Sequence, residues 1–503
     1  MPSRETPTIR SPRQLSLPAF LFLLLAFFGF IAAINGWEYG RILEISEDPG
    51  DKRAMLSNLA RSSTTLISTV FACLFLAIPL TANMYTPQLL DLFVGSWTNR
   101  LVLLFYVFSA AYSISLGRVS RGVDVPSWHF KLAEIVVLVS MVLLLPYLFS
   151  VFRFLDPNTI VRRVGARAMR ALDPGASGRI ADRRDELTRR IRQLGNIALK
   201  SLERSDRDVA LAAGSALDTC ASRYLELKPE HGEAWFRVGP DQFPGLAREA
   251  LEFVNDDRVW VEMEIQRELN RAFTAALAKV PDVISAISRA QRHTAVEASR
   301  RGDRGALELA LRHFNNFLRE AVKRRDIHAI YDLLYQFRML GEELWERDAA
   351  RVVKAARHLD YYGRLARDTG VGFAYDLVAY DLGALAAAVP STGDGDLSAL
   401  VDVFLEVGRG RDGSELAPGV FKARLVTAAL MRERDRVELA ERIEATLGGS
   451  GSAQWEIAER DVLGDTEPWF WEVTDRMRDL NYLPESARRH VREELDRLRY
   501  GKA

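Results

Sequence analysis

Cysteine is scarce in this sequence, and the residue patterns that hold metals or phosphates are missing. Cys73 and Cys220 are the only two cysteines among 503 residues. They are too few for a disulfide framework and are expected to be reduced. There is no His-Glu-x-x-His, Cys-x-x-Cys, Walker-type loop or Gly-x-Ser-x-Gly elbow, and the seven histidines do not fall at metal-ligand spacings. The sequence therefore predicts no cofactor, no metal site and no catalytic residue.

Neither sign of charge is in excess. Lysine and arginine total 67, and aspartate and glutamate also total 67, so no global field draws the chain to nucleic acid. The mean hydropathy of −0.06 is low for a polytopic transporter, because a strongly apolar first third is averaged with a charged remainder. The length exceeds what a single hydrophobic core usually serves, so more than one folding unit is expected.

Four apolar runs in the first third are each long enough for a membrane-spanning helix. They cover residues 18–34, 65–82, 101–116 and 133–152. Their interiors carry no charged side chain except Glu134, near the start of the fourth run. Trp37, Trp97 and Trp128 lie just beyond a run, where an amphipathic ring favours the headgroup level. These features predict a four-helix transmembrane domain over residues 18–154.

Basic residues flank this block on both sides. Arg4, Arg10 and Arg13 precede the first run; a signal peptide has the same pattern, but the run is long for one, which favours an uncleaved helix. Arginines also follow the fourth run. The positive-inside tendency predicts a cell (plasma or inner) membrane protein with a cytoplasmic N-terminal tail, residues 1–17, and a cytoplasmic C-terminus.

The segment after the fourth run, residues 155–178, is a basic juxtamembrane segment. A helix restarts after Asp156-Pro157, and it carries four arginines: Arg162, Arg163, Arg167 and Arg170. Three of them are spaced at i, i+4 and i+7, on one face. We expect these arginines to contact anionic phospholipid headgroups. The alternative is a topogenic charge run that is simply solvated.

Small residues recur every four positions in the third run, at Ser109, Ser113 and Gly117. Such a stripe lets helix backbones approach closely. We therefore predict helix packing here. The alternative is a polar pathway lined by Ser109, Tyr112 and Ser113, which the lack of an ionisable group disfavours.

The region around the second and third runs resembles a known family. Thr86-Pro-Gln-Leu-Leu follows an apolar span that begins near Ser68-Thr69, and Asn99-Arg100 leads into the third run. This order is similar to a family of bacterial predicted membrane proteins of unknown function, over about residues 64–170. The family has a Ser-Pro-Arg-Leu-Leu-like segment here, so Thr86 and Gln88 depart from its pattern. The resemblance implies four helices before a cytoplasmic region, and it implies no activity.

The rest of the chain predicts an all-α fold. Apolar residues return every three or four positions through residues 179–447, which indicates a cytoplasmic helical domain. Ser205 or Asp206 is expected to cap one helix, and Asp303, Asp326 and Asp348 each open a new run at intervals of about 22–23 residues. Short turns between such helices give antiparallel hairpins, arranged as a bundle or a short α-solenoid. The core is expected to contain an aromatic series: Phe314, Phe317, Tyr331, Tyr335, Phe337, Trp345, Tyr361 and Tyr362. The alternative is a ligand pocket among these rings, with core packing favoured.

A short linker, residues 448–452, precedes a C-terminal helical tail, residues 453–503. The tail has an aromatic cluster, Trp455, Trp469, Phe470 and Trp471. We expect this cluster to dock on the helical domain, with binding to a partner as the alternative.

These observations predict a non-enzymatic membrane protein. Four helices would anchor a cytoplasmic helical domain that binds an unidentified protein partner, in a bilayer containing anionic phospholipids. An oligomeric channel or transporter is the alternative, and it requires a homo-oligomer. A membrane-bound enzyme is the least favoured reading, since no local catalytic motif supports it.

Overall fold

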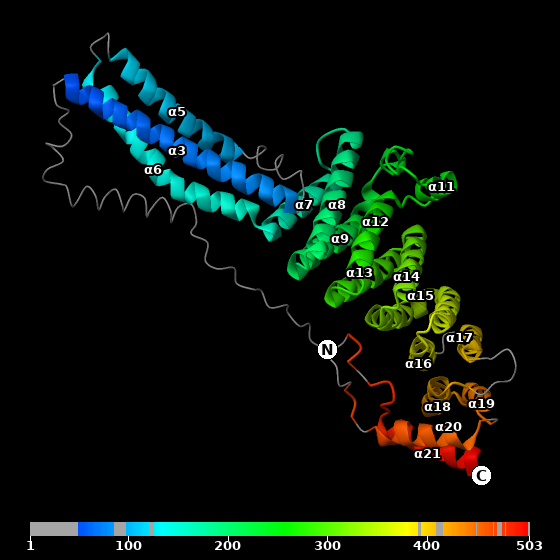
Figure 1. Cartoon of the computed structure of the whole chain (residues 1–503). Coiled ribbons are helices and arrows are strands. Elements are labelled where there is room, and N and C mark those ends of the chain that lie inside the picture. The colour runs from blue at the N-terminus through cyan, green and yellow to red at the C-terminus, as the bar shows by residue number, and fades with distance from the viewer. Residues whose placement is uncertain are drawn as a thin grey trace. The chain divides into compact units, whose positions relative to one another are not determined.

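The described part of the chain is helical. The computed structural model describes residues 49–84, 97–120, 125–390, 394–408, 416–448, 450–465, 467–469, 475–477 and 479–500. These residues contain helices and no β-strand, which confirms the all-α prediction (Figure 1). The chain divides into two compact units, Met1–Thr159 and Ile160–Ala503.

The first unit contains three long apolar helices that all contact one another: α3 (Pro49–Met84), α5 (Trp97–Val119) and α6 (Ser127–Leu155). Within the described residues, the stretches long and apolar enough to cross a membrane are Gly50–Leu76, Asn99–Val119 and Ser127–Arg153. They correspond to the second, third and fourth predicted runs. The first predicted run, residues 18–34, lies outside the described residues.

Helix α3 begins earlier than the sequence analysis predicted, at Pro49 instead of near residue 65. Proline is tolerated at the start of a helix, which allows α3 to begin at Pro49. After Gly50, no glycine or proline interrupts the sequence before Pro79. Thr64 and Thr65 also donate their hydroxyls to carbonyls four residues earlier, at 2.8 and 2.9 Å. Polar residues are thereby accommodated inside the helix.

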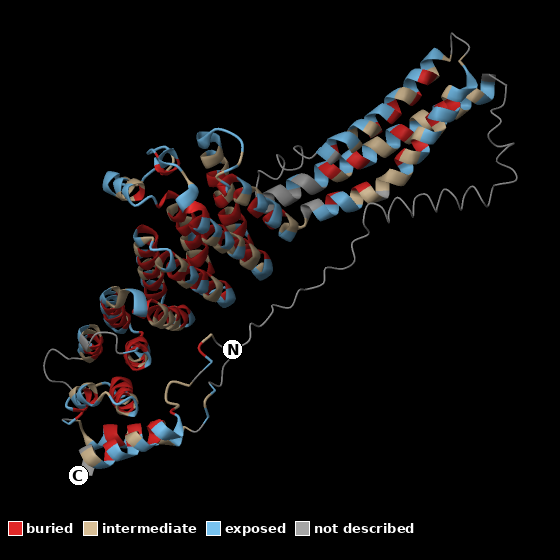
Figure 2. Cartoon of the chain, turned by 180° about the vertical axis from the view of Figure 1, so that it is seen from behind, coloured by how far each residue is buried: buried red, intermediate tan, exposed pale blue. Residues whose placement is uncertain are grey.

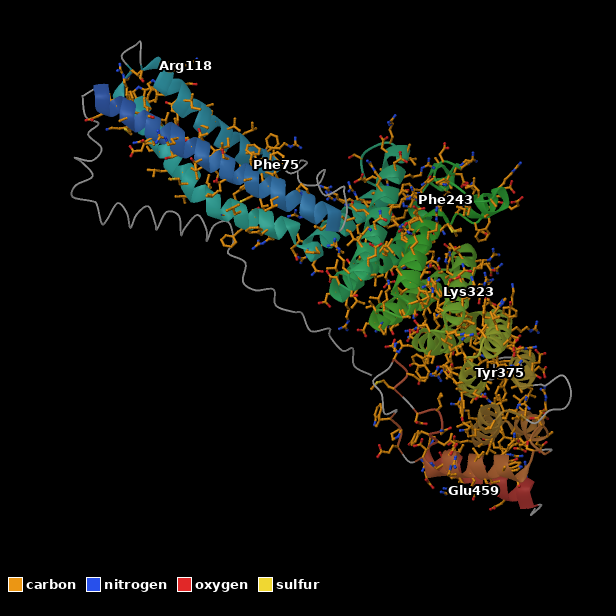
Figure 3. The ribbon with its side chains drawn as sticks, viewed as in Figure 1. Phe75, Arg118, Phe243, Lys323, Tyr375 and Glu459 are labelled. Carbon is orange, nitrogen blue, oxygen red and sulfur yellow. The ribbon has the colours of Figure 1, made fainter. Side chains whose placement is uncertain are left out.

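The outer surface of the first unit is apolar. Phe75 and Leu76 of α3 are 73% and 74% exposed, and Leu104 and Phe149 of the other two helices are 63% and 70% exposed. Phe75 and Arg118 are labelled in Figure 3. Such an outward apolar surface is typical of helices that face lipid or a partner.

The second unit begins within α7 (Pro157–Leu172) and continues as a series of helix pairs. The main helices are α8 (Ile180–Glu203), α9 (Arg207–Leu227), α12 (Trp260–Ala276), α13 (Pro281–Arg300), α14 (Arg304–Arg324), α15 (Ile327–Asp368), α16 (Phe373–Ala388), α17 (Asp394–Glu406), α18 (Pro418–Glu433), α19 (Val437–Glu444), α20 (Ser452–Ala458) and α21 (Glu485–Tyr500). The short η1 (Lys228–Glu230), α10 (Glu233–Phe236) and α11 (Arg248–Asp256) lie between α9 and α12, and η2 (Glu459–Leu463) follows α20.

These helices stack in two layers. Helices α8, α12 and α14 form one layer, and α9, α13 and the first half of α15 form the other; each helix contacts its partner and the next helix of its own layer. Figures 1 and 2 show the pairs following one another, with buried residues gathered on the faces that meet. Because packing is between neighbours along the chain, this arrangement is that of an α-solenoid.

Helix α15 changes layer at Asp348, whose φ of −154° and ψ of 66° interrupt the helix. After this break, Arg351 reaches Glu308 of α14 at 3.2 Å. Before it, Gly341 approaches Leu385 of α16 so closely that an added Cβ would lie 2.9 Å from the leucine side chain. The first half of α15 and α16 are therefore neighbours in one layer, and the second half returns beside α14.

Aspartates open the helices as predicted. Asp303, Asp326 and Asp348 accept hydrogen bonds from the amides of Ala306, Ala329 and Arg351 at 2.9, 3.0 and 3.1 Å. Asp206, not Ser205, caps α9 by accepting from the amide of Val209 at 3.3 Å. Each bond satisfies an amide that a helix start leaves without an internal partner.

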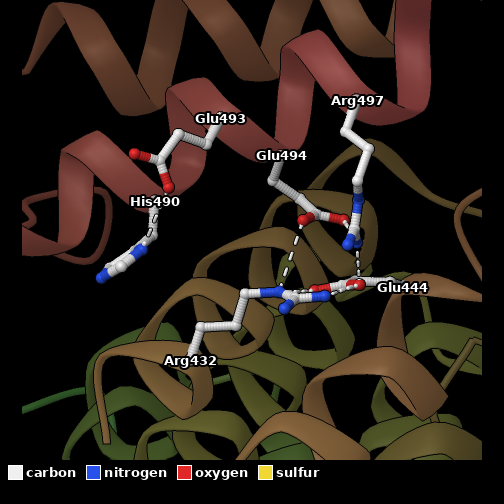
Figure 4. A network of polar contacts seen from close by, with 6 residues as sticks. All are labelled: Arg432, Glu444, His490, Glu493, Glu494 and Arg497. Atoms are coloured by element: carbon white, nitrogen blue, oxygen red, sulfur yellow. Dashed lines mark hydrogen bonds and ion pairs between the residues drawn. The ribbon is translucent and has the colours of Figure 1, made fainter. Parts of the chain in front are cut away.

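The end of the chain packs on α18. Trp455 of α20 is 4% exposed and meets Phe421 of α18 edge to face, in a core that also contains Val491 of α21. Above this core, Arg432 pairs with Glu444 at 2.5 Å, and Arg497 of α21 contacts both Glu444 and Glu494 (Figure 4). Trp455 docks as predicted, whereas Trp469 is 66% exposed, and Phe470 and Trp471 lie outside the described residues.

Candidate functional site

The predicted small-residue stripe of α5 lies at the contact between apolar helices. Ser109 and Ser113 are 1% and 0% exposed, and an added Cβ at Gly117 would lie 4.0 Å from Leu56 of α3. Ser113 donates its hydroxyl to the Ser109 carbonyl at 2.9 Å. Tyr112 is half-buried, with its hydroxyl 3.1 Å from His129 Nδ1. These contacts fit helix packing, the first of the two interpretations.

The predicted arginines of α7 are divided between exposed and half-buried positions. Arg162, Arg163 and Arg170 are exposed, while Arg167 is half-buried. Burial, together with the nearby Arg190, lowers the pKa of the Arg167 guanidinium. The opposite side of α7 is buried; Val164 and Ala168 are both 0% exposed. The helix therefore presents a basic face of three arginines, with the fourth beside α8.

Sequence reasoning missed the most elaborate site, which is formed by residues 475–481, here called the strap. The strap is an irregular segment before α21, and its residues 475–477 and 479–481 are described. Figure 1 shows this red segment leaving α21 toward the helices of the solenoid. It contacts α13, α15 and α16.

Arg476 is buried against α15 and α16. Its two terminal nitrogens donate to the two carboxylate oxygens of Asp381 at 2.6 and 2.8 Å. The guanidinium carbon lies 4.7 Å from the ring centre of Tyr331 and 5.3 Å from that of Tyr335. The side chains of Arg476 and Asp381 are 4% and 1% exposed. A bidentate pair between aromatic rings is a strong mode of guanidinium recognition.

Two further strap residues make polar contacts on either side of Arg476. The carboxylate of Asp475 accepts from the Gln336 side chain of α15 at 3.0 Å and lies 3.4 Å from Arg289 of α13. Asn481 accepts from the Tyr380 hydroxyl of α16 at 2.8 Å. The strap thus crosses three successive helices of one layer, running from α13 toward α16.

A second carboxyl lies beside the strap. Asp332 of α15 is 4% exposed. Burial, and then the negative charge of Asp475, raise its pKa to about 6. Ser288, His328 and Arg289 act in the opposite direction. The ionisation of Asp332 is therefore coupled to the position of the strap.

An open pocket continues the same layer beyond the strap. It lies between α9 and α13, has a volume of about 430 Å³, and is lined by apolar residues such as Leu211, Val283 and Ile287 together with Asp218 and His293. Arg289 lines this pocket and also contacts Asp475. The strap and the pocket therefore share one surface.

The predicted aromatic core is correct in part. Phe314, Phe317 and Trp345 are fully buried. Tyr331 and Tyr335, in contrast, are half-buried and hold Arg476, and Tyr361 is 59% exposed. The i, i+4 spacing of Tyr331 and Tyr335 was the one available signal for a shared aromatic face, but it is also what a core helix shows.

The buried ion pairs elsewhere join helices to one another. Lys228 donates to Glu262 of α12 and to Asp303, both at 2.6 Å. Because Asp303 also caps α14, this group fastens three parts of the solenoid together. Within the described residues there is no group of three or more histidine, cysteine, aspartate or glutamate side chains that could hold a metal ion.

Apolar helices of membrane-spanning length, followed by a stack of helix pairs, define the class as a helical membrane protein. Residues 14–198 match a family described as "Predicted membrane protein (DUF2254)". The match confirms the resemblance to a membrane protein family of unknown function and extends it on both sides of residues 64–170. Comparisons with curated proteins and with solved structures found no match.

Proposed function

We propose that this chain is a non-enzymatic, multi-pass protein of the cell membrane that presents a helical protein-binding domain to the cytoplasm. Four helices, including the predicted first run at residues 18–34, form the anchor, and both termini are cytoplasmic. The arginines that precede the first run and follow the fourth support this orientation. The outward apolar side chains of α3, α5 and α6 support the anchor.

One observation carries the binding role: the solenoid already holds an irregular segment of its own chain. Arg476, from an irregular part of the chain, is held by Asp381 and by two tyrosine rings. Stacked helix pairs provide extended surfaces that commonly bind peptides and proteins. The surface that accepts the strap thus has the chemistry required to accept a segment of another protein.

The basic face of α7 supports contact with anionic lipid in the same setting. Arg162, Arg163 and Arg170 are exposed, and each arginine near an anionic membrane surface contributes about 1 kcal/mol. Such contacts would hold the start of the helical domain at the headgroups, with α7 as the juxtamembrane helix.

Cross-linking in native membranes, followed by mass spectrometry, tests the binding role. We expect residues 180–503 to be joined to a second protein. Cross-links to lipids and to the chain itself alone would count against a binding domain. Topology is tested by an Ile180→Cys variant in a background lacking Cys73 and Cys220; labelling from outside the cell would refute the cytoplasmic placement.

A channel is the competing function, and ion flux separates the two. Ser109 and Ser113 are buried, and Ser113 donates to the Ser109 carbonyl within the same helix, which supports helix packing over a pore lining. We expect the chain reconstituted in liposomes to show no conductance under an applied potential. A conductance of the wild-type chain would favour the channel.

A further inference from the structure

We propose that Tyr331, Tyr335 and Asp381 form a binding site for an arginine in an irregular segment of a partner protein, and that Arg476 fills this site until such a segment displaces the strap. This inference rests on the proposed binding function and deepens it, because it names the chemistry of the partner and the element that controls access.

The receiving side of the site is built on two packed helices. Tyr331 and Tyr335 stand one turn apart on α15, and Asp381 lies on α16. Arg338 supports the carboxylate from 3.6 Å. A planar guanidinium can pair with both carboxylate oxygens and stack on the ring faces, whereas a lysine ammonium lacks this bidentate fit and this stacking. The site therefore selects arginine.

Arg476 makes the most buried polar contact among the described strap residues. The two outer contacts of the strap are made by Asp475 and Asn481 through polar groups. Met477, next to Arg476, is 44% exposed. The described strap residues form no helix. Loss of the Arg476 contact would remove the one buried side chain among the described strap residues.

A partner segment must make contacts beyond those of the strap, because the tethered strap competes at an effective concentration on the order of millimolar. The pocket between α9 and α13 offers such contacts. The strap runs from α13 toward α16, so residues that precede a bound arginine point toward this pocket, whose apolar lining includes Leu211, Val283 and Ile287. The favoured partner segment therefore carries an acidic residue and then an arginine, with an apolar residue before them. Its carboxylate replaces that of Asp475 beside Arg289.

Peptide binding to the full chain in lipid nanodiscs tests this inference. The probe is a labelled peptide with the sequence of residues 470–484, and the matched control peptide has alanine in place of arginine at position 476. We expect the probe to bind an Arg476→Ala chain at least about tenfold more tightly than the wild-type chain, since the competing strap is released. The control peptide should bind neither chain, and adding Asp381→Asn to the Arg476→Ala chain should abolish binding of the probe.

Hydrogen exchange of α15 and α16 checks that each variant is folded. An Arg476→Lys chain is a milder second variant, and we expect it to bind the probe with an affinity between those of the wild-type and Arg476→Ala chains. Equal binding of the two peptides, or equal binding by wild-type and Arg476→Ala chains, would overturn the inference. A concentration-dependent dimer that Arg476→Ala abolishes would assign the site to the strap of a second copy and would also overturn it. If neither peptide binds, but native cross-links join a second protein to other faces of the solenoid, the proposed binding function would be supported and this inference would be refuted.

Discussion

The substitution Asp381→Asn removes the carboxylate that receives both terminal nitrogens of Arg476. Each hydrogen bond to a charged group contributes about 1.5–3 kcal/mol. Asparagine keeps one acceptor oxygen at the same place, so we expect the strap to lose about 2–3 kcal/mol of docking free energy. This corresponds to a roughly 30- to 150-fold larger population of the detached strap. In the docked state the substitution leaves the buried Arg476 guanidinium without its counter-charge, so we expect the cost to fall on docking of the strap and not on the helices of the solenoid.

Hydrogen exchange with mass spectrometry measures this change directly. The Asp479 amide donates to the Pro468 carbonyl at 3.2 Å in the docked strap, and a peptide covering residues 475–483 should lose protection. Asp475→Asn is the matched control, because Asp475 is more exposed, at 27% of its side chain, and such pairs contribute about 0–1 kcal/mol. Equal loss of protection in the two variants, or a loss spread over α13, α15 and α16, would refute the assignment of Arg476 as the main contact.

Three other predictions address the anchor, the basic helix and pH. Ser113→Leu should overpack the contact of α3 with α5 and destabilise the first unit by about 1–3 kcal/mol. This should lower the melting temperature in detergent. Ser115→Leu, at an exposed position of the same helix, should have little effect. Replacing Arg162, Arg163 and Arg170 by glutamine should remove the extra exchange protection that α7 gains from anionic lipid in nanodiscs, about 1 kcal/mol per arginine, while Lys323→Gln should leave it unchanged. Burial and the charge of Asp475 raise the pKa of Asp332 to about 6. Asp332 therefore holds its proton more readily when the strap is docked than when it is detached, and its ionisation should weaken docking as the pH rises through about 6. An Asp332→Asn chain should show no such pH dependence. Burial and Glu444 also raise the pKa of Glu494 in α21 to about 7, so a Glu494→Gln chain separates the titration of that group from the titration of Asp332.

Local features of the sequence were good predictors of helices. The aspartates at positions 303, 326 and 348 identified helix starts because an N-cap depends on residues only three positions apart. The apolar runs identified the three described membrane-length helices for a similar reason. The start of α3 was misplaced because hydropathy detects the part of a helix that suits lipid, not its charged first turns.

The arginine site could not be read from the sequence. Arg476 and Asp381 are 95 positions apart, and nothing near Arg476 distinguishes it from the other arginines of the tail. Tyr331 and Tyr335 looked like core residues, since an i, i+4 aromatic pair serves a core and a binding face equally well. Only the stacking of α15 beside α16 brings the two rings and the carboxylate together.

We propose that the strap and the pocket beside it mark a surface for another protein. Photo-cross-linking in native membranes tests it most directly, with the photoreactive residue at Leu211, which lines the pocket on α9, and a control at Lys323 of α14, labelled in Figure 3. We predict that Arg476→Ala increases the capture of a second protein from Leu211 and leaves capture from Lys323 unchanged. Capture from Leu211 that does not respond to Arg476→Ala would contradict the account.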